Sequence, residues 1–187
     1  MRKATYEDRG KVVSILLEAF KNNKSVNYIA WKEEAQIRYL MEYSFDNCMD
    51  TGEIYISDNG SACAMIQFHD RKKSLWKSIY LDIQLILKTI GVGNIRKALA
   101  RESFIKKHYP KEPFTYLWFV GVTPERQRNG FGSEILKYVL DYSKTLNRPV
   151  YLETSTESNL PWYQKYGLDI YTVSDRFGFP FYFLKND

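Results

Sequence analysis

The sequence predicts an α/β domain with a mixed, mostly antiparallel central sheet flanked by helices. Three observations support this prediction. Apolar side chains recur at helical spacing in several segments, and short β-like runs separate those segments. An Asn-Gly pair at residues 59–60 predicts a tight turn between two strands. The 187 residues, 44% of them hydrophobic, are enough to bury the core of one domain covering residues 1–187.

Composition argues against several classes of protein. The net charge of +5 comes without any run of five basic residues, so we expect no nucleic-acid partner. No apolar stretch is long enough to span a bilayer as a helix, and the N-terminus lacks the apolar core of a signal peptide, so we expect no membrane partner and a cytoplasmic location. Cys48 and Cys63 lie in apolar periodic segments, which predicts buried free thiols in a reducing compartment. No cluster of residues has metal-ligand spacing, so no metal is expected.

The N-terminal segments alternate between strand and helix patterns. Residues 2–5 are predicted to form a short strand, and apolar residues at helical spacing predict helices over residues 12–20 and 37–48. Residues 22–31 between these helices are polar with a few apolar residues, among them Trp31. We predict a loop there, which is either a lid or a packed connection.

A hairpin is predicted next. Residues 53–57 and 61–68 form two apolar runs around the turn at residues 58–60. An Asn-Gly pair in this position favours a type I′ turn, in which both Asn59 and Gly60 take a positive φ.

Residues 70–112 interrupt the alternation of strands and helices. Periodic apolar residues predict one helix over residues 75–90, stopped by the Gly-Val-Gly at residues 91–93, and a second basic helix over residues 95–107. We interpret this region as a helical insertion between two strands of the sheet. It is either a helical pair that covers a face of the sheet or one wall of a substrate pocket.

The C-terminal half begins with a near-continuous apolar run that predicts a central strand covered on both faces. The predicted elements are a strand at 114–122, a helix from Gly132 to Leu146, a strand at 150–155, a short helix at 159–166, and a final hairpin of strands at 170–174 and 179–184.

A basic glycine loop at residues 127–132 (QRNGFG) joins the central strand to the following helix. Backbone N–H groups at the start of a helix have no intrahelical partner, and the helix dipole favours an anion there. The loop lacks the third glycine of a dinucleotide fingerprint, because Ile135 occupies that position, and it lacks the Gly-Lys-Ser/Thr of a P-loop. Taken alone, the pattern therefore predicts either a phosphate cradle for some other ligand or an ordinary basic turn between a strand and a helix.

This loop resembles motif A of the GNAT superfamily of N-acetyltransferases. Residues 159–168 (NLPWYQKYGL) resemble a second signature of that superfamily, an asparagine followed by Tyr-x-x-x-Gly-Phe, with Leu168 in place of the phenylalanine. Residues 151–155 (YLETS) and 111–113 (KEP) resemble the puromycin N-acetyltransferase branch. The similarity covers roughly residues 111–167.

The resemblance implies a GNAT-like fold and a binding site for acetyl-CoA. The pantetheine arm would lie along the central strand, where Gly121 suggests a bulge or the close approach of another backbone. An N–H group of the strand would polarise the thioester carbonyl, and N–H groups of residues 128–133 would hold the pyrophosphate. Arg126, Arg128 or Lys165 would neutralise further phosphates. The residues implied in cofactor binding are Val120, Gly121, Val122, Gln127, Arg128, Asn129, Gly130, Phe131, Gly132, Ser133, Asn159 and Lys165. Asn159 is alternatively, or in addition, a helix N-cap.

Two residues are predicted to carry the chemistry. Position within the second motif makes Tyr163 the expected general acid, which protonates the leaving thiolate. Glu153 is the best candidate for the base that takes the ammonium proton, directly or through water; it is alternatively a strand-end carboxylate that holds local structure. On a strand from Val150, Glu153 shares a face with Tyr151 and Ser155. His69 and His108 are weaker candidates for the base.

We therefore expect an N-acetyltransferase that moves the acetyl group of acetyl-CoA to a primary amine of a small molecule by direct attack. Alternatives are a non-catalytic CoA-binding sensor or scaffold, a protein lysine or N-terminal acetyltransferase, and a nucleic-acid-binding domain. The sequence leaves the acceptor unnamed and leaves a homodimer open.

Overall fold

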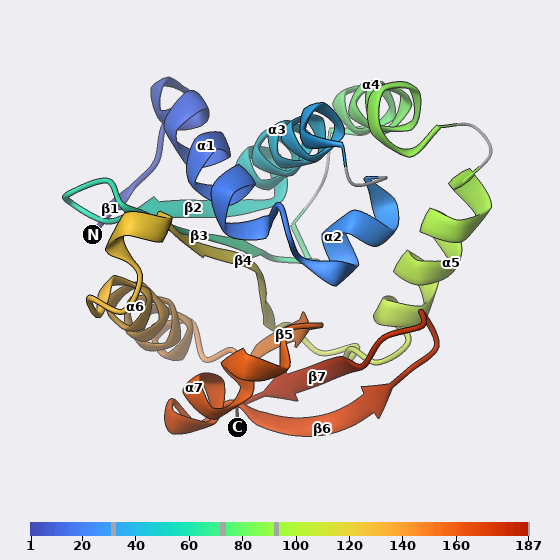
Figure 1. The fold of residues 1–187 in the computed structure, drawn as a ribbon. Coiled ribbons are helices and arrows are strands. Elements are labelled where there is room, and N and C mark those ends of the chain that lie inside the picture. Colours follow the sequence, from blue (N-terminus) through green and yellow to red (C-terminus); the bar gives the residue numbers. More distant parts are fainter. Residues whose placement is uncertain (31–32, 72–73, 92–93, 187) are drawn as a thin grey trace.

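The computed structural model describes residues 1–30, 33–71, 74–91 and 94–186 (Figure 1). One seven-stranded sheet runs through the protein in the order β1-β2-β3-β4-β5-β7-β6. Every neighbouring pair is antiparallel except β4 with β5, so the predicted mixed, mostly antiparallel sheet is confirmed. The strands are β1 Arg2–Lys3, β2 Gly52–Ile56, β3 Ala62–Gln67, β4 Thr115–Val122, β5 Val150–Thr154, β6 Asp169–Ser174 and β7 Phe181–Lys185.

Helices cover both faces of the first half of the sheet (Figure 1). Side chains of β4 enter both cores. Phe119 packs in one cluster with α1 and α3, and Leu117, on the other side of a bulge at Trp118, packs in the opposite cluster with α6. The apolar stripes of α1 and α6 are buried in these two cores, as their periodicity predicted. The helices are α1 Arg9–Phe20, α2 Lys24–Ile29, α3 Glu34–Thr51, α4 Leu75–Leu85, α5 Ile95–Lys106, α6 Phe131–Thr145 and α7 Leu160–Lys165, with short 3₁₀ turns η1 Tyr6–Asp8, η4 Pro124–Arg126 and η5 Glu157–Asn159.

The predicted loop over residues 22–31 is wrong for its central part, which forms α2. The side chain of Asn23 caps this helix by accepting a hydrogen bond from the Val26 N–H at 3.0 Å. Six residues carry too little periodic signal to reveal a helix that tertiary contacts stabilise. Trp31 lies outside the described residues.

The hairpin is confirmed, but its predicted turn type is wrong. Gly60 has φ of 65°, whereas Asn59 is not among the residues with positive φ. The Gly60 N–H donates to the Ser57 carbonyl at 2.7 Å, and the Asn59 side chain accepts from the Ser61 N–H at 3.1 Å. The connection is therefore a longer turn that ends in a left-handed glycine, and the Asn59 side chain supports it.

The insertion at residues 70–112 divides into two parts with different surroundings. Helix α4 continues as a π-helical turn, η2 Ile86–Ile90, and packs beside α3 at the end of the helical layer rather than over the sheet (Figure 1). Helix α5 buries Ile105 among the aromatic residues of β7 and the β6–β7 turn. Of the two helices of the insertion, α5 covers the sheet and α4 does not. The Gly-Val-Gly at residues 91–93 is predicted to end the first of these helices, and two of its residues, Val92 and Gly93, lie outside the described residues.

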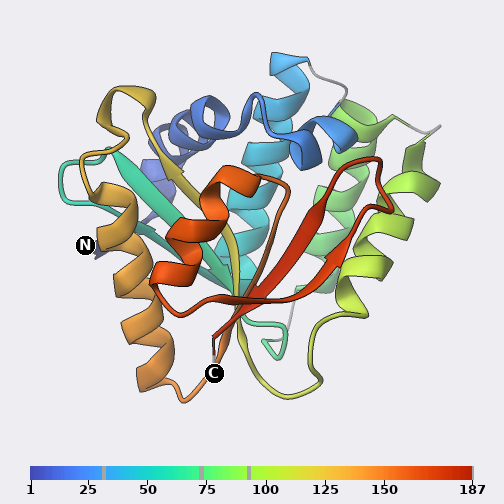
Figure 2. The same cartoon turned by 60° about the horizontal axis from the view of Figure 1, so that its bottom comes forward.

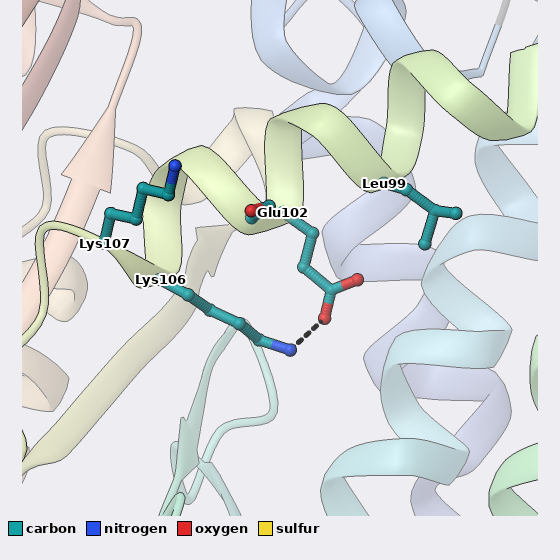
Figure 3. A pocket seen from close by; sticks show the side chains of 5 residues that line it. Leu99, Glu102, Lys106 and Lys107 are labelled. Atoms are coloured by element: carbon teal, nitrogen blue, oxygen red, sulfur yellow. Dashed lines mark ion pairs between the residues drawn. The ribbon is translucent and has the colours of Figure 1, made fainter.

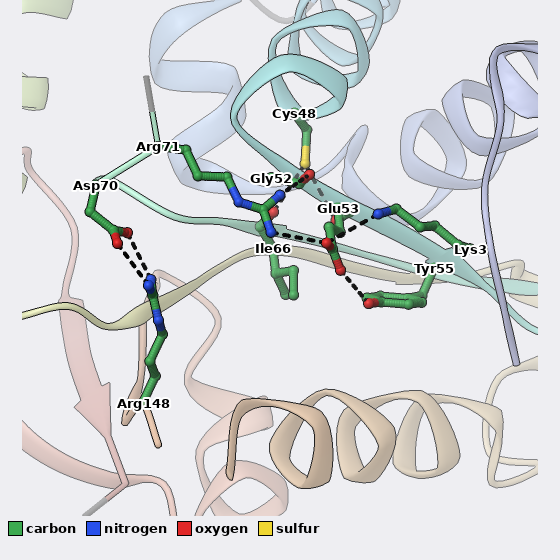
Figure 4. Close-up of polar contacts among 9 residues, drawn as sticks. All are labelled: Lys3, Cys48, Gly52, Glu53, Tyr55, Ile66, Asp70, Arg71 and Arg148. Carbon is green, nitrogen blue, oxygen red and sulfur yellow. Dashed lines mark hydrogen bonds and ion pairs between the residues drawn. The ribbon is translucent and has the colours of Figure 1, made fainter. Parts of the chain in front are cut away.

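A polar network holds the first two strands to the segment after β3 (Figure 4). The buried Glu53 carboxylate accepts a hydrogen bond from Tyr55 Oη and pairs with Arg71 at 3.0 Å and Lys3 at 3.1 Å. Burial alone would raise the pKa of Glu53, but the hydrogen bonds from Tyr55, Arg71 and Lys3 outweigh it and lower the pKa to about 2. Glu53 therefore remains a charged structural residue at any physiological pH.

Candidate functional site

The two parallel strands separate soon after they begin. Strand β5 pairs with β4 only at Thr115↔Val150 and Tyr116↔Tyr151. Beyond this point β4 continues along β3 as far as Val122, while β5 continues along β7 as far as Thr154. The facing edges of β4 and β5 are therefore unpaired with each other over the second half of β4.

The unpaired edge of β4 presents backbone polar groups. The Thr123 N–H donates to the Ser61 carbonyl at 2.9 Å, which sets the alternation of hydrogen-bonded pairs along β3 and β4. In this register Gly121 bonds to β3, while Val120 and Val122 direct their backbone groups away from it, towards the gap. An extended ligand arm would find hydrogen-bonding groups at Val120 and Val122.

Of the two alternatives predicted for Gly121, a bulge or the close approach of another backbone, the bulge is wrong. The bulge falls at Trp118, because Met65 pairs with Phe119 and the next residue of β3, Ile66, already pairs with Leu117. A Cβ on Gly121 would lie 3.0 Å from Leu16 Cδ2, so the glycine instead permits α1 to pack closely on the sheet. Gly121 therefore affects the site through the close packing of α1 against β4.

The basic glycine loop lies at the open end of this gap. Gln127, Arg128, Asn129 and Gly130 are exposed, and α6 begins immediately after them at Phe131. Arg128 and Gly130 both take positive φ, 63° and 86°, so the loop turns sharply to lead into the helix. The side chain of Gln127 donates to the Val122 carbonyl at 3.3 Å, which ties the loop to the end of β4.

Helix α7 brings the second motif against this loop. Trp162 Nε1 donates to Ser133 Oγ at 3.0 Å, and a Cβ on Gly132 would lie 3.6 Å from the Trp162 ring. Lys165 is exposed on α7. Figure 2 shows α7 between α6 and the β6–β7 hairpin. The two motifs, about thirty residues apart in sequence, are thus adjacent in space.

Tyr163 is buried, with 8% of its surface exposed, and its ring packs 4.7 Å from that of Trp162. Burial, and then the charge of Glu153, raises the pKa of Tyr163 well above its ordinary value. Its phenol is therefore neutral at pH 7 and has a proton to give.

Asn159 stands at the start of α7 but is exposed and makes no capping hydrogen bond, so the predicted N-cap role is not realised.

Glu153 is held by two tyrosines that the sequence analysis missed. Tyr116 Oη donates to Glu153 Oε1 at 2.6 Å, and Tyr109 Oη donates to Oε2. Burial and the Glu153 charge raise the pKa of both tyrosines well above the ordinary value. Among the described residues no lysine or arginine forms an ion pair with Glu153. Tyr109 and Tyr116 lie 44 and 37 residues away in sequence, so no local pattern could reveal them.

The two histidines belong to the aromatic packing around this carboxylate. His69 stacks on Tyr116 with ring centroids 5.5 Å apart. His108 stacks on Phe183 at 4.5 Å, and its Nδ1 lies 2.8 Å from the Phe104 carbonyl oxygen. Both rings therefore have evident structural roles.

Helices α2 and α5 meet over the C-terminal end of β5. The Ser25 N–H donates to Ser155 Oγ at 3.3 Å, and Asn23 Nδ2 donates to Thr156 Oγ1 at 3.2 Å. Arg101 reaches from α5 to donate to Ser25 Oγ, and its Nε is buried without a hydrogen-bond partner among the described residues. Ser155 at the end of β5 thus points towards α2, and Glu153 lies on the same face of the strand by alternation.

The other surface features lie apart from this site. A hollow on the outer side of α5 is lined by Leu99, Glu102, Ser103, Lys106 and Lys107, with an ion pair between Lys106 and Glu102 at 2.6 Å (Figure 3). None of these is a predicted site residue. Within the described ranges, no group of three or more His, Cys, Asp or Glu side chains is arranged to hold a metal ion, and no helix is long and apolar enough to cross a membrane.

An open edge of β4, an exposed basic glycine loop at the start of α6 and a buried phenol on the adjacent α7 together form the candidate site. Residues 15–168 match the model of the Acetyltransferase (GNAT) family. The chain therefore belongs to this family, and it is an acyltransferase that uses acetyl-CoA.

Solved structures of low sequence identity share the fold. A histone acetyltransferase HPA2 and related acetyltransferase from Corynebacterium glutamicum is 20% identical with a TM-score of 0.70, over 99% of this chain and 93% of that one. A mosquito arylalkylamine N-acetyltransferase like 5b is 13% identical with a TM-score of 0.61, over 99% and 97%. The C-terminal condensation domain of Ebony is 10% identical with a TM-score of 0.71, over 99% and 96%.

Proposed function

We propose that this protein is a single N-acetyltransferase domain that transfers the acetyl group of acetyl-CoA to a primary amine of a small molecule. The observation that carries the proposal is the gap between β4 and β5, which ends at the basic glycine loop. Helix α7, which carries Tyr163, packs against the start of α6 after this loop through Trp162 and Ser133. The amine attacks directly. Both thiols are buried as predicted, and burial raises the pKa of Cys63 to about 12, so neither supports a covalent enzyme intermediate.

The donor would lie along the unpaired edge of β4. Backbone groups of Val120 and Val122 bond its pantetheine arm, and one of their N–H groups stabilises negative charge on the thioester oxygen. The N–H groups of residues 128–133 receive the pyrophosphate at the N-terminus of α6. The exposed side chains of Arg126, Arg128 and Lys165 neutralise phosphate charge, and the exposed Asn159 side chain is available to the arm.

Tyr163 and Glu153 would carry the proton transfers. The neutral Tyr163 phenol donates its proton to the departing thiolate. Glu153 takes a proton from the substrate ammonium, directly or through water, while Tyr109 and Tyr116 hold its carboxylate in position. The same two hydrogen bonds also suit the alternative of a structural carboxylate, and the two roles predict different activities for a Glu153→Gln enzyme.

The acceptor would bind near the C-terminal end of β5, under α2 and α5, and we call this region the acceptor side. Contacts there support a small acceptor. The Tyr28 ring of α2 packs against Phe177 and Phe179 of the β6–β7 turn, with centroids 5.5 and 5.9 Å apart. This bridge between α2 and the hairpin restricts the room for an extended peptide. The resemblance of residues 151–155 to the puromycin branch favours an antibiotic-like amine. The buried thiols support a reducing, cytoplasmic location.

Substitution of Tyr163 by Phe tests the catalytic assignment. Turnover should fall about 100-fold because the thiolate loses its proton donor, while CoA binding by calorimetry should change little. Tyr166→Phe, three residues further on, is the matched control and should retain activity. Full turnover by the Tyr163→Phe enzyme would refute the acid assignment. Normal CoA binding without acetyl transfer by the wild-type protein to any amine tested would favour a non-catalytic sensor.

The acceptor class is tested by release of free CoA with matched substrates. Small primary amines should support turnover, whereas peptides that offer an N-terminus or a lysine should not. Turnover confined to the peptides would identify a protein acetyltransferase and refute the small-molecule proposal, while leaving the acetyltransferase activity intact.

A further inference from the structure

Helix α4 and its π-helical extension expose a continuous apolar face. Trp76 is 82% exposed and Leu87 is 70% exposed, while Leu81 and Ile90 of the same segment are buried. The exposed members lie at helical spacing on one side of the helix. They are Leu75, Trp76, Ile79, Tyr80, Ile83 and Leu87, and we call them the α4 face.

A helix that is apolar on both sides is normally covered on both sides. Here α3 covers one side, and α4 stands at the outer end of the helical layer with its other side towards solvent (Figure 1). Contiguous exposed apolar patches of this kind mark interaction surfaces. We therefore expect a partner to cover the α4 face.

The charge of the surrounding segment indicates the nature of that partner. Residues 70–90, which lead into and form α4 and η2, contain five Lys and Arg against two Asp and Glu, whereas the rest of the chain contains 22 against 20. More than half of the net positive charge thus belongs to the segment that carries the α4 face. A second copy would bring like charges together, so the occupant should be anionic.

We propose that the α4 face binds the surface of an anionic phospholipid bilayer. Helices that lie in the membrane interface combine an apolar face of aliphatic and aromatic residues with flanking Lys and Arg, and Trp76 and Tyr80 supply side chains suited to the headgroup region. Lysines of residues 70–90, among them the exposed Lys88, then meet the anionic headgroups. The expectation of no membrane partner rested on the lack of a spanning segment and of a signal peptide, which does not bear on surface binding.

This surface shares no residue with the proposed acetyl-CoA site, so the two proposals succeed or fail separately. The position of the α4 face also suggests why the protein would bind a membrane. Helix α5 follows the α4 segment in the chain, and its Arg101 contacts Ser25 on the acceptor side. An enzyme held at a membrane surface would meet amines that partition there.

Sedimentation with vesicles tests the proposal. The full-length protein should bind vesicles of phosphatidylglycerol and phosphatidylcholine, and bind far less to phosphatidylcholine alone. The double variant Trp76→Ser, Leu87→Ser should bind the anionic vesicles at least about tenfold more weakly, because burial of these two side chains is lost. The matched control is Val173→Ser on β6, which removes an apolar side chain that is 55% exposed elsewhere. It should bind as the wild type does.

Three outcomes would overturn the proposal. These are no binding to anionic vesicles at low salt, equal binding to neutral vesicles, or a dimer in analytical ultracentrifugation that the double variant abolishes, which would make a second copy the occupant. A circular dichroism spectrum and acetyl transfer to a water-soluble amine like those of the wild type would show that the double variant is folded. If it is not, Leu75→Ser alone provides the same comparison, with an expected loss of vesicle binding.

Discussion

Glu53 on β2 and Glu153 on β5 are two carboxylates on the same sheet, and each accepts hydrogen bonds from tyrosine. Glu53 also pairs with Arg71 and Lys3, and its pKa is lowered to about 2 (Figure 4). Glu153 accepts only from the neutral phenols of Tyr109 and Tyr116 within the part of the chain that the structure describes.

Under the proposed function, this difference separates the structural carboxylate Glu53 from the proposed base Glu153. A carboxylate whose charge is balanced by two cations holds its neighbours together and resists protonation. A carboxylate held by phenols alone is oriented without being neutralised, so it retains its attraction for a proton or for a substrate ammonium. On the same face of β5 as Ser155, which points towards α2, Glu153 fits the second description and Glu53 the first.

The largest expected effect is on activity. Glu153→Gln should lower kcat/KM by about 100-fold at neutral pH, because the isosteric amide cannot take the ammonium proton. Steady-state assays with acetyl-CoA and an accepted amine would measure this. Glu53→Gln is the matched control and should retain activity within about twofold, since Glu53 is remote from the gap. Equal activities of the Glu153→Gln and wild-type enzymes would show that Glu153 is structural.

The second largest effect is on stability, and here Glu53→Gln is expected to lose more than Glu153→Gln. Glu53→Gln should lower the free energy of unfolding by about 2 kcal/mol, because Arg71 and Lys3 lose a buried partner. Urea denaturation at neutral pH would measure it, with Glu153→Gln for comparison. A smaller loss for Glu53→Gln than for Glu153→Gln would contradict the division of roles.

Stability should also depend on pH through Glu53. Its folded pKa of about 2 lies below its ordinary value of 4.5, so the unfolded chain binds the proton first as the pH falls. The contribution of Glu53 is complete above pH 4.5 and is lost as the pH falls to about 2. The unfolding free energy of Glu53→Gln should therefore fall less steeply across this window than that of the wild type.

The smallest effect should come from removing single phenols. Tyr116→Phe should reduce kcat by about threefold to tenfold, because the Glu153 carboxylate loses one of the two hydrogen bonds that orient it; steady-state assays would measure this. Tyr55→Phe, the corresponding change at Glu53, should cost about 1 kcal/mol of stability and leave kcat unchanged. A lower kcat for Tyr55→Phe but not for Tyr116→Phe would contradict the comparison.

The sequence by itself determined the strand, loop and helix that are proposed to bind the acetyl donor. The apolar run, the basic loop and the following helix are contiguous, so local physical chemistry placed β4, residues 127–132 and α6 in the correct order. The strand periodicity likewise predicted the faces of β5. These features depend on neighbours a few residues apart, and short-range patterns record such neighbours well.

Only the tertiary structure decided the rest. It assigned Gly121 to the close packing of α1, moved the bulge to Trp118, made a helix of residues 24–29 and joined Tyr109 and Tyr116 to Glu153. It also left the α4 face exposed, although its apolar spacing looks like that of a buried helix. Each of these depends on segments far apart in sequence, and their contacts form only when the whole sheet is assembled.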